Sequence, residues 1–84
     1  MPNLTNEQLW KHNYVANELT DALNCATRGF VDYCEYHVKG AEEFVQVKLV
    51  LCNGNYDTMT VCVTGDSLWA ILKDVMRAVA KRYE

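Results

Sequence analysis

The pattern of apolar and polar positions divides the chain into a helix, three strands and a second helix. From residue 5 to residue 28, apolar residues recur every three or four positions, which is the period of one helix face. Thr5 to Gln8 has the composition of a capping box, and Gly29 is a natural stop, so a helix is predicted between them. Its expected core-facing residues are Leu9, His12, Val15, Ala16, Leu19, Ala22, Leu23 and Ala26.

Alternating apolar residues predict three strands, in residues 30–38, 44–52 and 57–64. In the last two strands the positions expected to point inward are all odd-numbered: Val45, Val47, Leu49, Leu51, Met59, Val61 and Val63. Opposed residues of an antiparallel pair share a face, so their numbers must add to an even total here. A two-residue Asn53-Gly54 turn gives an odd total, and we therefore predict a loop of three or five residues.

For the first hairpin, the expected register pairs Val38 with Val45. This register places Tyr36 on Val47 and Cys34 on Leu49 inside, and it sets Glu35 against Lys48 outside. An opposite-charge cross-strand pair favours that choice.

The closing helix follows Gly65, and its expected inner face consists of Leu68, Leu72, Val75, Met76, Val79 and Tyr83. Asp66 or Ser67 is the expected N-cap, and the Asp66 carboxylate is expected to fill the anion site formed by the free amides. The order α-β-β-β-α predicts a two-layer α+β fold, with a three-stranded antiparallel sheet and both helices on one face. With 84 residues, the chain is expected to form one domain, residues 1–84.

Composition and charge narrow the classes of function. The net charge is −3, which disfavours nucleic acid as the main partner, but the charge is uneven. Residues 1–66 hold nine acids and four bases, whereas the closing helix carries Lys73, Arg77, Lys81 and Arg82 against two acids. The apolar runs are too short for a membrane span and the first residues lack a signal-peptide pattern, so a cytoplasmic protein is expected. The four cysteines lack zinc-ligand spacing, and we expect them to be reduced and mostly structural.

The element order resembles that of the double-stranded-RNA-binding domain over nearly the whole chain. That family carries lysines at the start of its last helix to grip phosphates. Here the matching stretch, Asp66 to Leu72, contains an acid and no lysine, so the resemblance is one of topology. An RNA-binding role, the alternative hypothesis, would have to use the basic stripe Lys73, Arg77 and Lys81.

Catalytic chemistry finds little support in the sequence. Cys34 and His37 are three apart on a strand, so they lie on opposite faces and cannot pair locally. His12 falls in the apolar stripe, where a core histidine is the simpler interpretation. The sequence contains no glycine-rich phosphate loop, nucleophile elbow or carboxylate pair, and we predict no catalytic residue, metal or cofactor.

Two surfaces are candidates for binding. The outer face of the first helix gathers two aromatics ringed by polar and acidic residues, a composition typical of a protein interface: Trp10, Tyr14, Asn17, Glu18 and Asp21, with Glu7 nearby. The other is the open face of the sheet, with Tyr33, Glu35, His37, Phe44, Gln46, Lys48, Val50, Thr60 and Cys62.

We therefore expect a small non-enzymatic module that binds a protein partner or a second copy of itself. No membrane and no small-molecule substrate are expected. In size, acidity and lack of catalytic groups the chain is similar to phage-encoded inhibitors of host defence, which would make it an inhibitor acting by surface occlusion. The alternative interpretation of Trp10 and Tyr14 is that the two rings stack on each other or cover the edge of the sheet.

Overall fold

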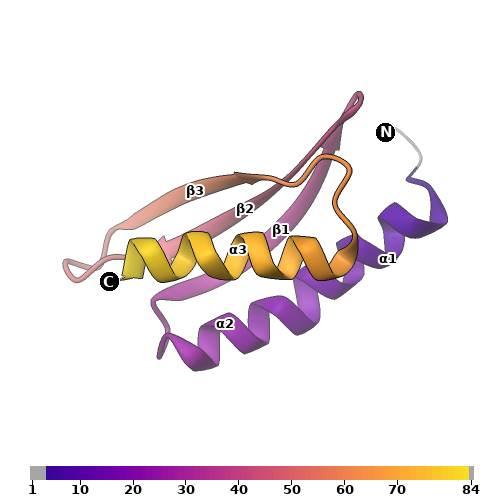
Figure 1. Cartoon of the computed structure of the whole chain (residues 1–84). Coiled ribbons are helices and arrows are strands. Elements are labelled where there is room, and N and C mark those ends of the chain that lie inside the picture. The colour runs from indigo at the N-terminus through magenta and orange to yellow at the C-terminus, as the bar shows by residue number, and fades with distance from the viewer. Residues whose placement is uncertain (1–3, 84) are drawn as a thin grey trace.

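One three-stranded antiparallel sheet and two helical stretches form the chain, in the predicted order α-β-β-β-α (Figure 1). The computed structural model describes residues 4–83. The elements are α1 (Asn6–Tyr14), η1 (Val15–Leu19), α2 (Thr20–Ala26), β1 (Val31–Lys39), β2 (Glu42–Val50), β3 (Tyr56–Cys62) and α3 (Leu68–Tyr83). The strand ends fall within two residues of the prediction.

The first helix begins at the capping box that the sequence predicts. The Gln8 backbone N–H donates to the Thr5 hydroxyl over 3.1 Å, and the Thr5 N–H donates to the Gln8 side-chain oxygen over 3.0 Å. The helix ends where Arg28, with φ of 54°, and Gly29, with φ of 90°, enter the left-handed region. The Gly29 N–H then donates back to the Asn24 carbonyl oxygen over 2.9 Å.

A π-helical turn, η1, interrupts this first helix and has a clear local cause. The Thr20 hydroxyl donates to the Val15 carbonyl oxygen over 2.9 Å, so that carbonyl is satisfied by a side chain five residues on. The same hydroxyl accepts the Cys34 backbone N–H of β1 over 2.9 Å. Helix and strand are thereby joined at the point where the helix widens.

The π turn explains why the predicted core stripe of this helix is largely wrong. The buried positions are four apart throughout, at Lys11, Val15, Leu19, Leu23 and Thr27. In a regular α-helix, successive residues four apart turn gradually away from the core. The wider π turn compensates for this rotation, so the buried residues before and after it face the same side. Val15, Leu19 and Leu23 are buried as predicted, whereas Leu9, His12, Ala16, Ala22 and Ala26 are exposed.

The register of the first hairpin differs from the prediction by two residues. Tyr36 pairs with Val45, Cys34 with Val47 and Val38 with Glu43. The strands close on a two-residue turn in which Gly40 has φ of 62°, because Gly at the first central position permits a type II′ turn. Each residue keeps its predicted face, but Glu35 lies opposite Gln46 and the proposed pair with Lys48 does not form.

The second hairpin confirms the predicted longer loop. Val50 pairs with Tyr56, which leaves the five residues 51–55 between the strands. The Leu51 N–H donates to the Asn55 carbonyl oxygen over 2.8 Å and closes the loop. The odd-numbered residues of both strands therefore stay on one face, as the parity argument requires.

A single core lies between the sheet and the helices. It contains Val15, Leu19, Leu23, Val31, Cys34, Tyr36, Val45, Val47, Leu49, Val63, Ile71, Val75 and Val79, so both helical stretches pack on the same sheet face (Figure 1). On α3, Ile71 takes a core position, whereas Met76 and Tyr83, predicted inside, are about half exposed. At the end of α3, Arg82 forms an ion pair with Asp57 of β3, and the Tyr83 ring lies 5.1 Å from the Phe30 ring.

Candidate functional site

A shallow hollow of about 210 Å³ lies on the outer face of the first helix, where the sequence predicts a binding surface. Its lining residues are Trp10, Asn13, Tyr14, Asn17 and Glu18. Trp10 on this rim is 59% exposed. Four of the five predicted interface residues therefore meet around one concavity.

The hollow differs from the prediction in three residues. Tyr14 is half-buried and packs against the core, so it contributes to stability as well as to the surface. Asp21 is exposed but does not line the hollow, because it follows the π turn, which changes its direction relative to Trp10. Asn13 lines the hollow and was missed, since it was not counted with the aromatic and acidic residues that define that face.

The open face of the sheet carries the residues predicted for it. Lys48 lies over the rings of Tyr33 and Tyr56, with its nitrogen 5.4 Å and 4.3 Å from the two ring centres. His37 stacks on Phe44 at 5.5 Å, and its Nε2 has no hydrogen-bond partner among residues 4–83. Tyr56 belongs to this face and was missed, because the strand was predicted to begin after it. A small hollow of about 100 Å³ is lined by Tyr33, Glu35, Gln46, Lys48 and Thr58.

The basic residues of α3 divide into two groups. Lys73, Arg77 and Lys81 are exposed and lie on one flank of the helix, as predicted. Arg82 instead forms an ion pair with Asp57 of β3. The flank available to an anionic partner is therefore limited to three cations, next to the acidic residue Asp74.

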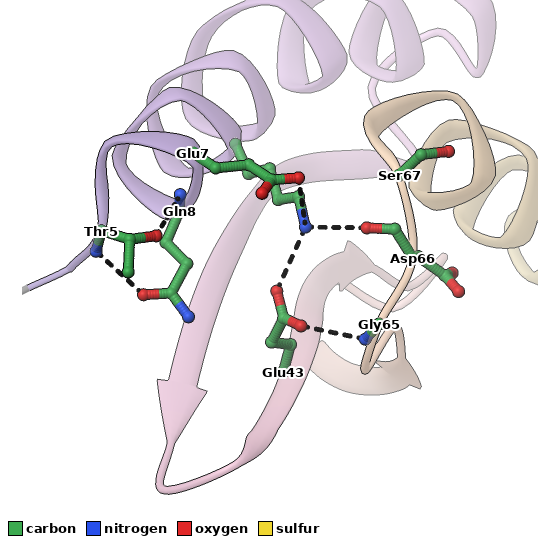
Figure 2. A pocket seen from close by; sticks show the side chains of 8 residues that line it. Thr5, Glu7, Gln8, Glu43, Gly65, Asp66 and Ser67 are labelled. Carbon is green, nitrogen blue, oxygen red and sulfur yellow. Dashed lines mark hydrogen bonds and ion pairs between the residues drawn. The ribbon is translucent and has the colours of Figure 1, made fainter.

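A polar pocket of about 450 Å³, which the sequence did not predict, lies where α1, β2 and the loop before α3 meet (Figure 2). Lys11 is only 5% exposed there, and its ammonium group donates to Glu43 over 3.3 Å and to the Asp66 carbonyl oxygen over 2.7 Å. The exposed Glu7 lies one turn earlier, 3.7 Å from the same nitrogen. The remaining lining residues are Thr5, Gln8, Gly65 and Ser67.

Glu43 is the acceptor that holds this pocket together. It accepts from the Tyr36 hydroxyl, from the Gly65 N–H over 2.9 Å and from Lys11. Burial alone would raise the pKa of Glu43, but these bonds outweigh it and hold the pKa below its ordinary value. For Tyr36, burial and the neighbouring Glu43 carboxylate both raise the pKa, so the phenol stays protonated. Since Lys11 and Glu43 bind one another, the arrangement is that of a structural ion pair.

The cap of α3 is Ser67, one of the two predicted residues. Its hydroxyl accepts the Ala70 N–H over 3.2 Å. The expectation that the Asp66 carboxylate fills the anion site at this helix start is wrong, since the Ala70 N–H donates to Ser67 and no backbone N–H of the described residues donates to the Asp66 carboxylate. The Asp66 carboxylate also points away from the Lys11 pocket (Figure 2). A close contact with the Asp74 carboxyl, with burial adding to it, raises the pKa of Asp66. The Oδ2 atom of Asp66 is buried and has no hydrogen-bond partner among residues 4–83.

All four cysteines are free, and Cys34 is the buried one. Burial raises the pKa of the Cys34 thiol to about 11, although the hydrogen bond with Thr20 opposes that shift. A thiol of this kind is a packing residue, because the thiolate is the reactive form. Within residues 4–83, no cluster of three or more His, Cys, Asp or Glu side chains could hold a metal ion.

No helix in the described part of the chain is long and apolar enough to cross a membrane. No protein-family model matches the chain, and no curated protein or solved structure matches it either.

Proposed function

We propose that this chain is a non-enzymatic protein-binding module whose contact surface is centred on Trp10. The observation that carries the proposal is the exposure of Trp10 on the rim of a hollow whose other members are polar or half-buried. Trp is the side chain most often found at the energetic centre of interfaces, where a neighbouring polar rim excludes water.

Trp69 of α3 is 73% exposed, so the helical layer displays a second tryptophan. A module of this kind acts by covering a surface of a larger protein, and we extend the proposal to inhibition of that protein, as phage-encoded inhibitors of host defence act.

The test is affinity purification from the native cell, with nuclease treatment, using the wild type and the Trp10→Ala and Tyr56→Ala variants. Tyr56 is a matched control, because it is 60% exposed but lies on the opposite layer. We expect the wild type and Tyr56→Ala to retain one partner protein after nuclease treatment. Trp10→Ala should lose it, since an aromatic anchor typically contributes ~2 kcal/mol or more.

Melting curves keep this test separate from a folding defect. Because Trp10 is mostly exposed, its replacement should leave the melting temperature nearly unchanged, unlike that of the half-buried Tyr14. Capture that nuclease abolishes, and that requires Lys73, Arg77 and Lys81, would instead support the RNA-binding alternative. Partner capture that survives Trp10→Ala would exclude this surface.

A further inference from the structure

The outer edge of β3 presents unpaired backbone groups. The Val63 N–H donates to the Glu43 carbonyl oxygen over 3.0 Å, which fixes the odd-numbered residues of this segment as those bonded to β2. In an antiparallel ladder successive residues point their N–H and C=O groups to opposite sides. The backbone groups of Thr58, Thr60 and Cys62 therefore point away from β2. Of these, the Thr58 N–H has a local acceptor, the Asp57 side chain.

The edge on the other side of the sheet is protected over the first half of β1. The Thr20 hydroxyl accepts the Cys34 N–H and lies 3.3 Å from the Cys34 carbonyl oxygen, and the Asn24 side chain donates to the Val31 carbonyl oxygen over 3.0 Å. The ladder of β1 is also irregular between Val31 and Tyr33, as a bulge requires. Helical cover and bulges are devices by which proteins block pairing at a sheet edge.

Among the described residues, side-chain protection of the β3 edge is found at its beginning, where Asp57 accepts the Thr58 N–H and forms an ion pair with Arg82. The following residues 58–65, TMTVCVTG, contain no charged residue and no proline, whereas β1 carries Asp32, Glu35 and Lys39. Edge strands usually carry charge or proline because an uncharged edge of β-forming residues pairs readily with another strand. On the inner face, Met59 and Val61 are only partly buried, so apolar surface also remains at this edge.

We infer that two copies of this chain pair through β3 and form a continuous six-stranded antiparallel sheet. A two-fold axis beside Thr60 pairs Thr60 with Thr60 of the second copy and Thr58 with Cys62. The same register sets Met59 against Val61 on the inner face, and it opposes no charge with a like charge, since Asp57 meets Val63. This self-complementarity is what selects a second copy as the occupant of the edge.

The decisive variants act on the one residue next to the axis. Thr60→Pro removes an N–H that β2 does not use, and proline is tolerated at such a position of an edge strand. Thr60→Lys keeps the N–H but places two like charges opposite one another. Thr60→Val is the matched control, because it preserves strand preference and the backbone donor.

The measurement is sedimentation equilibrium in the presence of reductant, at up to about 0.5 mM protein. At that concentration even a dissociation constant of ~0.1 mM populates the dimer. We expect the wild type and Thr60→Val to reach twice the 9.6 kDa chain mass, and Thr60→Pro and Thr60→Lys to remain at 9.6 kDa. A wild type that stays at 9.6 kDa, or a dimer that survives both variants, would overturn the inference.

Hydrogen exchange supplies a second readout at single residues. The Thr60 and Cys62 amides should exchange at least about tenfold more slowly in concentrated than in dilute wild type, because pairing buries them. The Val61 amide, which bonds β2, should be less sensitive to concentration. Trp10→Ala should leave the dimer intact. Loss of the dimer in Trp10→Ala but not in Thr60→Pro would assign association to the helical surface and refute edge pairing.

Discussion

The side-chain nitrogen of Lys11 lies 2.7 Å from the backbone carbonyl oxygen of Asp66, so the first helix is bonded directly to the loop that leads into α3. The same nitrogen donates to Glu43 of β2, which in turn accepts from Gly65. One buried cation therefore joins three segments that are far apart in the sequence. A charge at this depth is tolerated because each of its partners is an oxygen within the same pocket.

Replacing Lys11 with Met should lower the free energy of unfolding by about 3 kcal/mol, because Glu43 then remains buried without its ion-pair partner. Urea unfolding at pH 7 measures the change. Glu7→Gln is the control, since it removes only the exposed partner of Lys11 and should cost less than about 0.5 kcal/mol. Equal losses of unfolding free energy in the two variants would show that the buried Lys11–Glu43 pair stabilises the fold no more than the exposed Glu7 contact does.

The stability should also depend on pH through Glu43. Its pKa is lowered in the folded protein, so the unfolded chain binds this proton more tightly. The contribution of Glu43 is therefore complete above its ordinary pKa of 4.5 and is lost as the pH falls through the lower folded value. Melting temperatures of wild type and Glu43→Gln should converge below that pH. A difference between the two melting temperatures that stays constant from neutral to acidic pH would contradict this role of Glu43.

Asp74→Asn should stabilise the protein at neutral pH, by about 1 kcal/mol, because it replaces a close contact between two carboxyl groups with an amide that can donate to the Asp66 carboxylate. The raised pKa of Asp66 means that its contribution is most favourable below its ordinary pKa of 3.8 and declines as the pH rises through the folded value. The gain should consequently shrink in acid. Asp21→Asn, which removes an exposed acid elsewhere, is the control and should not reproduce the stabilisation in denaturant unfolding.

Thr20→Val should destabilise the protein by about 2 kcal/mol, since the Val15 carbonyl and the Cys34 N–H both lose a hydrogen-bond partner. Thr20→Ser retains the hydroxyl and should cost clearly less. Thermal unfolding of the two variants, followed by circular dichroism, makes the comparison. If Ser is as costly as Val, the methyl group and not the hydroxyl is what matters at this position.

Thiol titration should separate Cys34 from the other three cysteines. Cys25, Cys52 and Cys62 are exposed and should react with a thiol reagent in the native protein. Cys34 should react only after unfolding, because it is buried and its pKa is raised to about 11. Fewer than four thiols in denaturant without reductant would reveal a disulfide, and rapid reaction of all four in the native state would contradict the burial of Cys34.

The parts of the structure that follow local rules could be predicted from the sequence. The capping box at Thr5 and the five-residue loop after Val50 depend on neighbouring residues and on facing parity, and both were predicted correctly. The buried face of the first helix was predicted only at Val15, Leu19 and Leu23. The Thr20 hydroxyl that bonds Val15 at the π turn also bonds Cys34, which lies 14 residues away and is invisible to helical spacing. The Lys11 pocket was missed for the same reason, since Glu43 lies 32 residues away in sequence.

The hollow around Trp10 was predicted in most of its members because it lies largely within one helix. Helical spacing alone places Trp10, Tyr14, Asn17 and Glu18 together. Spacing could not show that Tyr14 also touches the core, nor that Asp21 is directed elsewhere. Both depend on how the helix is set against the sheet.

The π turn between Tyr14 and Thr20 has a consequence for changes in chain length. Lys11 anchors the helix ahead of this turn at Glu43, and Thr20 anchors it behind the turn at Cys34. Deleting one residue between 16 and 18 should restore regular α-helix with little rotation, because a five-residue π turn covers nearly the same angle as four residues of α-helix. Drawing all five residues into α-helix without a deletion would instead rotate one half against the other by about 100°, and the two anchors could no longer be satisfied together. The π turn therefore absorbs one extra residue, and the direction of the Trp10 surface relative to the sheet depends on that turn being kept.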